Sequence, residues 1–295
     1  MNKIQRIGPV LFTILLSLVS VSACQPGRRT TLRLATTTST YDSGLLDEIL
    51  PDFESRNDVH VEVIAVGTGQ ALALGERGDV DVVLVHDPLR EEAFVADGHG
   101  VDRTVLMYND FVVVGPQEDP AGVRGLSTAA EAFMKIAAEE ADFASRGDQS
   151  GTHGREMQIW KELSLQPTAE QAWYLSLGQG MGATLQFANE RRAYTLTDRG
   201  TFLAQMHNLA VLEVLVGGDS FYENQDESLL NCYSVIIVNP EQHPSVEFEL
   251  AVDFVRWISD PATKARISEI GLERFGQPLF YPADPDASKP VPGSG

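Results

Sequence analysis

Five short turns in this chain are built from hydroxyl side chains, glycine or both, in a way that suits binding of a small anion. Hydroxyl groups offer O–H donors, and glycine lets the backbone approach closely. A helix that begins at such a turn also presents free N–H groups and the positive end of its dipole. One turn of this kind is more often an ordinary helix cap, but five in one chain favour a donor-rich pocket for an anion with several oxygens. The turns are Thr36–Thr40, Gly67–Gly69, Ser150–Thr152, Gly180–Thr184 and Thr197–Thr201.

Arg146 is the cation that we expect at this pocket, because it follows a predicted strand and precedes Ser150 by four positions. A guanidinium can present two parallel N–H groups to an oxyanion. Asp148 comes two positions later and could orient that guanidinium, although a turn-forming aspartate is an equally good interpretation. Asp198 and Arg199 form a second pair of this kind, in which Arg199 could instead make a surface ion pair.

The sequence lacks the patterns of common enzyme classes. Gly67-Thr68-Gly69 has no third glycine of a dinucleotide-binding loop, because position 72 is Leu72, and there is no phosphate-loop or nucleophile-elbow motif. Ser150, His153 and Asp148 supply the residue types of a catalytic triad, but they crowd into one turn, whereas triads draw on separated segments. The six histidines have no metal-ligand spacing. We therefore predict a binding protein without cofactor or metal rather than an enzyme, with a periplasmic serine hydrolase as the less favoured alternative.

The segments that would position these residues alternate between strand and helix patterns. β-branched or apolar runs predict strands at residues 32–35, 60–66 and 79–85, and apolar residues at helical spacing predict helices at 45–53 and 70–76. This β-α-β-α-β order indicates an α/β fold with a parallel sheet and right-handed crossovers. Ligands of open α/β sheets bind beyond the carboxyl ends of the strands, where several of the hydroxyl turns lie.

Two similar segments indicate how the chain divides into lobes. Asn109–Pro116 and Asn231–Pro240 each combine an asparagine, an aromatic residue, a β-branched run and a proline. We interpret them as long strands that carry the chain out of one lobe and back into it; two unrelated buried strands are the alternative. The interpretation predicts a discontinuous lobe I, residues 31–110 and 231–282, and a lobe II, residues 111–230.

Both ends of the chain look different from the part between them. Residues 1–23 have a basic start, an apolar stretch too short to span a bilayer and then small residues, which is the order of a secretory signal peptide. Cys24 follows, as in the bacterial lipobox, whose cysteine becomes the lipid-modified first residue; an ordinary signal with an incidental cysteine is the alternative. We expect residues 24–30 to be a lipidated tether, which would hold the protein outside the cytoplasm at a membrane. Residues 283–295 are rich in Pro, Asp, Ser and Gly and are expected to be a disordered tail.

The acidic composition excludes one class of partner. The chain has 22 basic and 42 acidic residues, a net charge of −20, and removal of residues 1–23 takes away two positive charges to leave −22. Nucleic acid is a poor partner for such a protein, because affinity for the phosphate backbone comes from Lys and Arg. A small anion is not excluded, because donors in a closed cleft act at short range, while salt screens surface charge beyond about 10 Å.

Three segments, in their order along the chain, resemble the tungstate-binding proteins of ABC uptake systems, the TupA family. They are Leu34–Thr40 with Ser43–Leu46, Ser145–His153 and Tyr194–Thr201, and the likeness runs from about Thr31 to about Tyr281. The resemblance implies a type II periplasmic-binding fold, in which two α/β lobes, each a mostly parallel sheet flanked by helices, are joined by two crossover strands. It also implies tungstate as the ligand in the cleft, delivery of the ion to an ABC permease with its ATPase, and a monomeric protein.

By this resemblance, Arg146 and the turn at residues 36–39 would contact the oxyanion, and other turns and helix starts would complete the site. The predicted binding residues are Thr36, Thr37, Thr38, Ser39, Thr68, Arg146, Ser150, Gly151, Thr152, Gly182, Thr184 and Thr197, with Asp148 and Asp198 as orienting residues.

The identity of the anion stays open between several oxyanions. The Arg-x-Asp-x-Ser-Gly-Thr run at residues 146–152 also resembles phosphate-binding proteins of the same fold, and molybdate and sulfate are further alternatives. Phosphate carries a proton at neutral pH, so its site profits from a buried carboxylate acceptor. Tungstate, molybdate and sulfate are fully deprotonated, and a carboxylate facing them would repel them. The residue that could act as this acceptor is Asp148.

Overall fold

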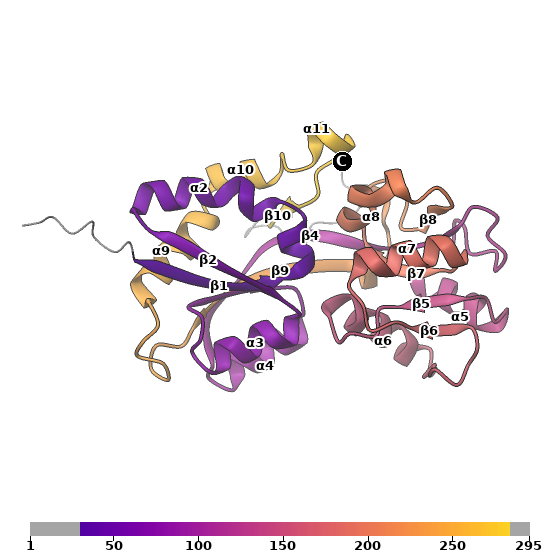
Figure 1. Ribbon diagram of the computed structural model, residues 1–295, viewed down its shortest axis with the longest axis horizontal. Coiled ribbons are helices and arrows are strands. Elements are labelled where there is room, and N and C mark those ends of the chain that lie inside the picture. Colours follow the sequence, from indigo (N-terminus) through magenta and orange to yellow (C-terminus); the bar gives the residue numbers. More distant parts are fainter. Residues whose placement is uncertain (1–29, 284–295) are drawn as a thin grey trace, which may run out of the picture.

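The computed structural model describes residues 30–283. The predicted signal peptide (residues 1–23), residues 24–29 of the predicted tether with Cys24, and residues 284–295 of the predicted tail lie outside the described residues. The first residue of the predicted tail, Ala283, is instead buried, and its N–H donates to the Leu106 carbonyl at 2.9 Å. The last residue of the predicted tether, Thr30, accepts the N–H of His60 at 3.0 Å. Figure 1 shows two groups of helices and strands that are joined by a pair of long strands. The names lobe I and lobe II are used below for the predicted ranges, residues 31–110 with 231–282 and residues 111–230. Between residues 30 and 283, no helix has both the length and the apolar character that a bilayer crossing requires.

The sheet of lobe I has parallel strands at its centre. β1 (Thr31–Thr37) runs parallel to β2 (His60–Val66) on one side and to β3 (Val82–Val85) on the other. β9 (Leu230–Val238) lies antiparallel beside β3, and β4 (Gly100–Pro116) and the short β10 (Tyr281–Pro282) follow. The strand order is therefore β10-β4-β9-β3-β1-β2. All four residues of β3 are buried, as expected for an inner strand of a sheet that is covered on both faces.

Helices cover both faces of this sheet. They are α1 (Thr38–Asp42), α2 (Leu45–Asn57), α3 (Thr68–Glu76), α4 (Pro88–Ala96), α9 (Phe248–Ile258), α10 (Pro261–Ile267) and α11 (Leu272–Phe275). In Figure 1, α2, α9 and α10 lie on one face, and α3 and α4 lie on the other. The apolar stripe that predicts α2 is buried, and its Phe53 packs edge-on against Phe254 of α9 with ring centroids 5.2 Å apart.

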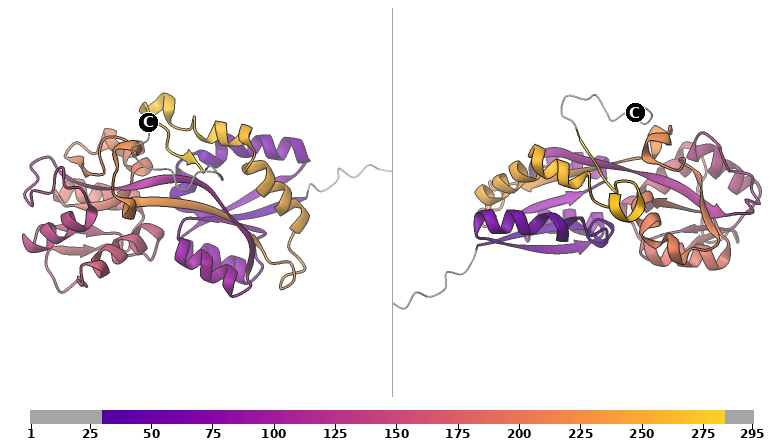
Figure 2. Two further views of the ribbon diagram at one scale, coloured as in Figure 1. Left: turned by 180° about the vertical axis from the view of Figure 1, so that it is seen from behind. Right: turned by 90° about the horizontal axis from the view of Figure 1, so that it is seen from above.

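β4 and β9 connect the two lobes (Figures 1 and 2). β4 pairs with β9 from Gly100 to Asp110, and from Phe111 on it pairs with β7 (Thr195–Asp198) and β8 (Leu212–Val216). The two similar sequence segments lie in β4 and β9. Their asparagines are register partners, and Nδ2 of Asn231 donates to Oδ1 of Asn109 at 2.7 Å.

Lobe II packs its helices around a small aromatic core. Its remaining elements are α5 (Ala129–Ala138), β5 (Phe143–Ser145), α6 (Gly151–Glu162), β6 (Tyr174–Ser176), α7 (Met181–Arg191), α8 (Arg199–Gln205) and the 3-10 helices η1 (Met206–Asn208), η2 (Phe221–Glu223) and η3 (Glu227–Leu229). The rings of Phe133 and Trp160 are 4.4 Å apart between centroids, and Phe143 lies against both. β5 runs parallel to β6 and ends at Ser145, so it presents Arg146 directly beyond its carboxyl end.

The predicted α/β class is confirmed, but the sheets are mixed rather than mostly parallel. Parallel pairing is found for β1 with β2 and β3, and for β5 with β6. Every strand that pairs with β4 among the described residues runs antiparallel to it. The cause is the connection itself, because β4 leaves lobe I and β9 returns to it in the opposite direction.

Candidate functional site

A cavity of about 390 Å³ lies between lobe I and lobe II. Lobe I contributes α1 and the residues after it, and lobe II contributes Arg146 and the first turns of α7 and α8. Its lining consists of Thr38, Ser39, Asp42, Ser43, Arg146, Gly180, Met181, Gly182, Ala183, Gly200, Thr201, Ala204 and Gln205. Three helices therefore begin at this cavity, which favours an anion there.

A second cavity of about 530 Å³ adjoins the first, since both are lined by Thr38, Arg146 and Gly180. The second cavity also touches the start of α3. Its full lining is Thr38, Gly67, Gly69, Gln70, Ala73, Arg146, Asp148, Gln149 and Gly180. Arg146 thus lies where the two cavities meet, and the hydroxyl of Thr38 belongs to the opposite lobe.

Arg146 is held in place by Asp148, as the sequence predicts. Nε and Nη2 of Arg146 donate to Oδ2 of Asp148 at 3.1 and 2.5 Å, and only 5% of Arg146 is exposed. Oδ1 of the same carboxylate accepts the N–H of Ser150 at 3.1 Å. Burial alone would raise the pKa of Asp148, but hydrogen bonds from Ser150 and the charge of Arg146 hold the pKa below its usual value. The carboxylate therefore stays charged and keeps the guanidinium oriented.

Two helices at the cavities begin without a side-chain cap. α3 and α7 start after Gly67 and Gly180, and no side chain among the described residues caps either start. In contrast, Thr128, Ser150 and Asp198 cap the starts of α5, α6 and α8. Because the first N–H groups of a helix have no partner inside the helix, those of α3 and α7 are available to a ligand.

The predicted hydroxyl residues differ in whether their proton is free. Thr36 donates to the Leu84 carbonyl at 2.8 Å, Thr184 to the Gly180 carbonyl at 3.1 Å, and Thr197 to the Asp198 carbonyl at 3.1 Å. A hydroxyl has one proton, so these three cannot at the same time donate to an oxyanion. The structure thus removes their hydroxyl groups from the set of donors that the sequence predicts.

The other hydroxyls of the first turn remain close to the cavities. Thr37 caps α1 by accepting the N–H of Thr40, and its Oγ1 lies 2.7 Å from Oγ1 of Thr40. Thr38 is exposed and lines both cavities, and Ser39 lines the first. Thr68 is buried, and its Oγ1 has no hydrogen-bond partner among the described residues.

The start of α6 lies behind the Arg146 turn rather than in the lining of either cavity. Oγ of Ser150 accepts the N–H of His153 at 3.3 Å, and Thr152 is 2% exposed. Gly151 packs against His86 of lobe I so closely that a Cβ would come within 2.7 Å of the ring. These predicted site residues therefore shape the turn that carries Arg146.

Asp198 does not orient Arg199, so that part of the sequence interpretation is wrong. Asp198 caps α8 by accepting the N–H of Thr201 at 2.8 Å. Arg199 is buried instead of exposed, and its Nη2 donates to Oδ2 of Asp110 at 2.6 Å and to the Gly217 carbonyl at 2.7 Å. The pair of Arg199 and Asp110 fixes the start of α8 to β4.

The alternative of a serine hydrolase finds no support in the geometry. Nδ1 of His153 accepts the N–H of Gln149 at 3.0 Å, and Ser150 contacts the backbone of His153 rather than its ring. Asp148 is paired with Arg146. Among residues 30–283, no group of three or more His, Cys, Asp or Glu residues is placed to hold a metal ion.

Several lining residues were not predicted from the sequence. Asp42 and Ser43 follow the first hydroxyl turn, and their position at the end of a helix of one turn could have indicated them. Gln205 lies at the C-terminal end of α8 and has no local signal. A Cβ on Gly182 would collide with the amide of Gln205, so this predicted residue lets α7 and α8 approach closely.

Comparison with known proteins adds to this geometry. The family model for a PBP superfamily domain matches residues 24–261. The tungstate-binding protein TupA of Peptoclostridium acidaminophilum is 43% identical over 251 residues, which are 84% of this chain and 84% of that protein. The solved structure of the tungstate-binding protein TupA from Desulfovibrio alaskensis is 46% identical, has a TM-score of 0.73 and covers 86% of this chain and 99% of its own. The solved structure of the tungstate ABC transporter from Geobacter sulfurreducens is 50% identical and has a TM-score of 0.69. The match covers 79% of this chain and 95% of the transporter chain.

Proposed function

Because the chain belongs to the PBP superfamily and to its family of TupA tungstate-binding proteins, we propose that it captures tungstate outside the cytoplasm and delivers it to the permease of an ABC transporter. The function is binding and transport rather than catalysis, and the ligand is an oxyanion rather than a cofactor. The ion binds between the lobes, where Arg146 and Thr38 line both cavities.

The orientation of Arg146 is the observation that carries this proposal. Its guanidinium is buried and clamped by Asp148, yet it borders two cavities into which the uncapped starts of α3 and α7 also open. A charged donor, free N–H groups and the Thr38 hydroxyl surround one place from different sides. Charge-assisted hydrogen bonds of this kind contribute about 1.5–3 kcal/mol each, and about six of them, discounted for desolvation, reach about −12 kcal/mol, which corresponds to nanomolar affinity.

The surroundings of Asp148 favour a fully deprotonated anion over phosphate. Both of its oxygens accept hydrogen bonds, from Arg146 and from the N–H of Ser150, so the carboxylate is turned toward its own turn. The other carboxylate in the cavity lining, Asp42, is exposed at the end of α1. The proton of hydrogen phosphate therefore meets no fully buried carboxylate among the described lining residues, whereas tungstate needs none.

Calorimetric titration of the purified protein with tungstate, molybdate, sulfate and phosphate tests this function. We expect tungstate to bind most tightly and phosphate at least a hundredfold more weakly, because phosphate must either lose its proton or leave it unpaired. Arg146→Ala should weaken tungstate binding by at least tenfold. Equal affinity for phosphate, or an Arg146→Ala variant that binds tungstate normally, would contradict the proposal.

We further propose that a lipid on Cys24 holds the mature protein at the outer side of a membrane, and that the protein is a monomer there. The basic start, apolar stretch and small residues that precede Cys24 support a mature chain that starts at this cysteine. Cys24→Ala should release the protein from the membrane fraction of the expressing cells, and intact mass spectrometry of the wild type should show the lipid. A protein that stays in the membrane fraction after this substitution would contradict the anchor.

A further inference from the structure

We propose that Arg90 is a positioning residue for the bound ion, because it fastens lobe I to the turn of lobe II that carries Arg146. The inference rests on the proposed function, since it concerns the same site. Arg90 belongs to α4 of lobe I, and its Nη1 donates across the lobe boundary to the carbonyl oxygen of Gln149 at 3.3 Å.

Arg90 is anchored on its own lobe by Asp87. Nε of Arg90 lies 3.2 Å from Oδ2 of Asp87, and the Arg90 N–H donates to Oδ1 of the same carboxylate at 3.3 Å. Asp87 is the N-cap of α4, so the helix and the guanidinium are held by one side chain. The guanidinium therefore reaches lobe II from a fixed base rather than as a free surface side chain.

Gln149 links Arg90 to the predicted anion contact. Its backbone has φ +61°, a left-handed conformation that is uncommon for a residue with a Cβ. The Gln149 N–H donates to Nδ1 of His153 at 3.0 Å, and its carbonyl accepts from Arg90. Asp148, which clamps Arg146, is the preceding residue. Contacts on both sides of Gln149 thus hold the backbone from which Asp148 orients the guanidinium.

The neighbourhood of Arg90 is a close contact between the lobes. A Cβ on Gly69 would lie 3.2 Å from Nη1 of Arg90, and one on Gly154 would lie 3.6 Å from Oδ2 of Asp87. Gly69 and Gln149 both line the second cavity. Arg90 therefore lies next to Gly69 on the lobe I side of this cavity and bonds Gln149 on its lobe II side, and its 3.3 Å hydrogen bond to Gln149 requires the lobes to be this close. Its loss should let the bound ion leave faster.

Three variants test the role of Arg90: Arg90→Gln, Arg90→Lys and the control Arg77→Gln. Arg77 has a 58% exposed side chain and pairs with Asp79 of its own lobe, so it matches the change in charge without a contact between lobes. Tungstate affinity is measured by calorimetry, and association and dissociation rates by stopped-flow mixing. We expect Arg90→Gln to raise the dissociation rate about fivefold with little change in association, Arg90→Lys to recover most of the loss, and Arg77→Gln to match wild type.

Each contrary result has a distinct meaning. Wild-type dissociation from Arg90→Gln, in a protein that binds tungstate, would overturn the role of Arg90 and leave the proposed function intact. A loss of tungstate affinity that comes only from slower association would show an effect of charge and would also overturn the role of Arg90. An equal loss of affinity in Arg77→Gln would do the same. A wild-type protein that does not bind tungstate would overturn both proposals.

Discussion

Two threonines of the first hydroxyl turn differ in what their side chains can still donate. The hydroxyl of Thr36 donates a hydrogen bond to the buried carbonyl of Leu84, whereas Thr38 is exposed and lines both cavities. We therefore expect Thr38→Val to weaken tungstate binding about tenfold, since a hydrogen bond to a charged group contributes about 1.5–3 kcal/mol. Calorimetry measures the affinity.

Thr36→Val is the matched control for this substitution. It should lower the free energy of unfolding by about 1 kcal/mol through the lost hydrogen bond to Leu84, with the tungstate affinity changed less than about twofold. Denaturant unfolding gives the first quantity. If Thr36→Val weakened binding as much as Thr38→Val, the assignment of these two hydroxyls would be wrong.

We expect His86 to make the stability of the protein depend on pH. It is 6% exposed, its Nδ1 is 3.0 Å from Oδ1 of Asn231, and its ring lies against Tyr233. Burial lowers the pKa of His86 from 6.5 to about 4, with a smaller opposing effect from Asn231 and a further lowering by Arg146. Between pH 6.5 and about 4, His86 is therefore protonated in the unfolded chain but neutral in the folded protein. The stability from neutral His86 is complete above pH 6.5 and falls, by about 3 kcal/mol at most, as pH drops toward 4.

His86→Gln tests this pH dependence, because glutamine can still donate to Asn231 but does not titrate. The difference in unfolding free energy between pH 7 and pH 4.5 should be smaller in this variant than in wild type. His60→Gln, at a position with a 64% exposed side chain, is the control. An unchanged pH dependence in His86→Gln would show that His86 is not the group that titrates.

How far a residue's role can be read from the sequence depends on the distance to its partner along the chain. Arg146 and Asp148 are two positions apart, and their contact was predicted from that spacing. Arg199 pairs with Asp110, 89 positions away, and the hydroxyl of Thr36 bonds a carbonyl 48 positions away. No local pattern contains these two partners. The hydroxyls of Thr184 and Thr197, in contrast, bond carbonyls only four and one positions away, and a backbone carbonyl is an acceptor that every residue offers, so residue types alone did not reveal these bonds either.

At the scale of elements, the uncapped start of α7 is the feature most open to a direct change. Gly180 adopts an extended N-cap conformation, and a Cβ there would have no atom within 4 Å among the described residues. Gly180→Asp should cap the helix and place a negative charge in the cavity. We expect tungstate affinity to fall at least tenfold, which calorimetry measures.

Gly180→Asn is the control, because it caps the same helix without the charge. Both variants should leave the unfolding midpoint equal to wild type or slightly higher. A similar loss of affinity in both would mean that space or the cap, rather than charge, matters at this position. Normal binding in Gly180→Asp would show that the anion does not approach α7.

Element boundaries followed the sequence where the signal was local. The strand His60–Val66 was predicted with the bounds that the structure has, and β1 (Thr31–Thr37) extends the predicted strand at residues 32–35 by one residue at its start and two at its end. α4, β6 and β8 were not predicted. β4 was recognised only from Asn109 on, because register shifts interrupt its pairing with β9 between Gly100 and Met107. Its change of partner after Asp110 depends on strands from distant parts of the chain.

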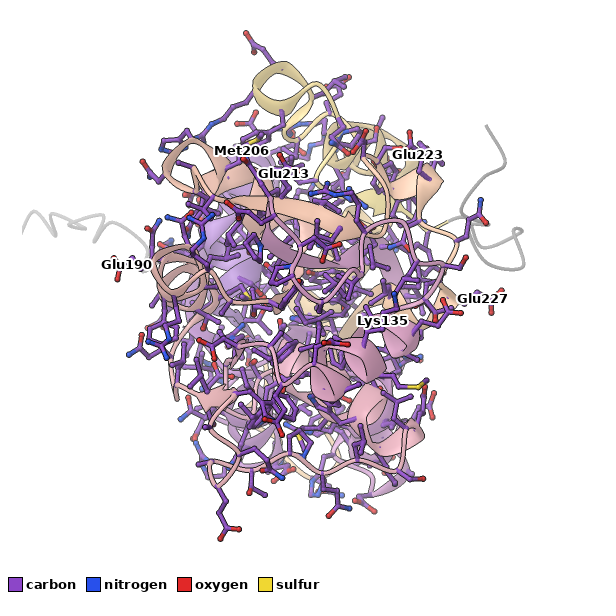
Figure 3. All side chains as sticks on the ribbon, turned by 90° about the vertical axis from the view of Figure 1, so that its right-hand side faces the viewer. Lys135, Glu190, Met206, Glu213, Glu223 and Glu227 are labelled. Carbon is purple, nitrogen blue, oxygen red and sulfur yellow. The ribbon has the colours of Figure 1, made fainter. Side chains whose placement is uncertain are left out.

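At the scale of the whole molecule, an acidic exterior surrounds a site built for an anion. The chain has a net charge of −20, and Figure 3 shows Glu190, Glu223 and Glu227 at the periphery of one end of the molecule. Surface charges of this kind are screened within about 8 Å at physiological salt. The groups that line the cavities act at hydrogen-bond distance, so local geometry rather than net charge decides what the protein binds.

The position of the tungsten atom tests the central claim most directly. Crystals grown with tungstate and measured at a tungsten absorption edge would show the metal by its anomalous scattering. The account predicts one strong site between the lobes, with the oxyanion in hydrogen-bond contact with Arg146, Thr38 and the first N–H groups of α7. A tungsten site elsewhere on the molecule, or a cavity that stays free of tungsten at saturating tungstate, would contradict it.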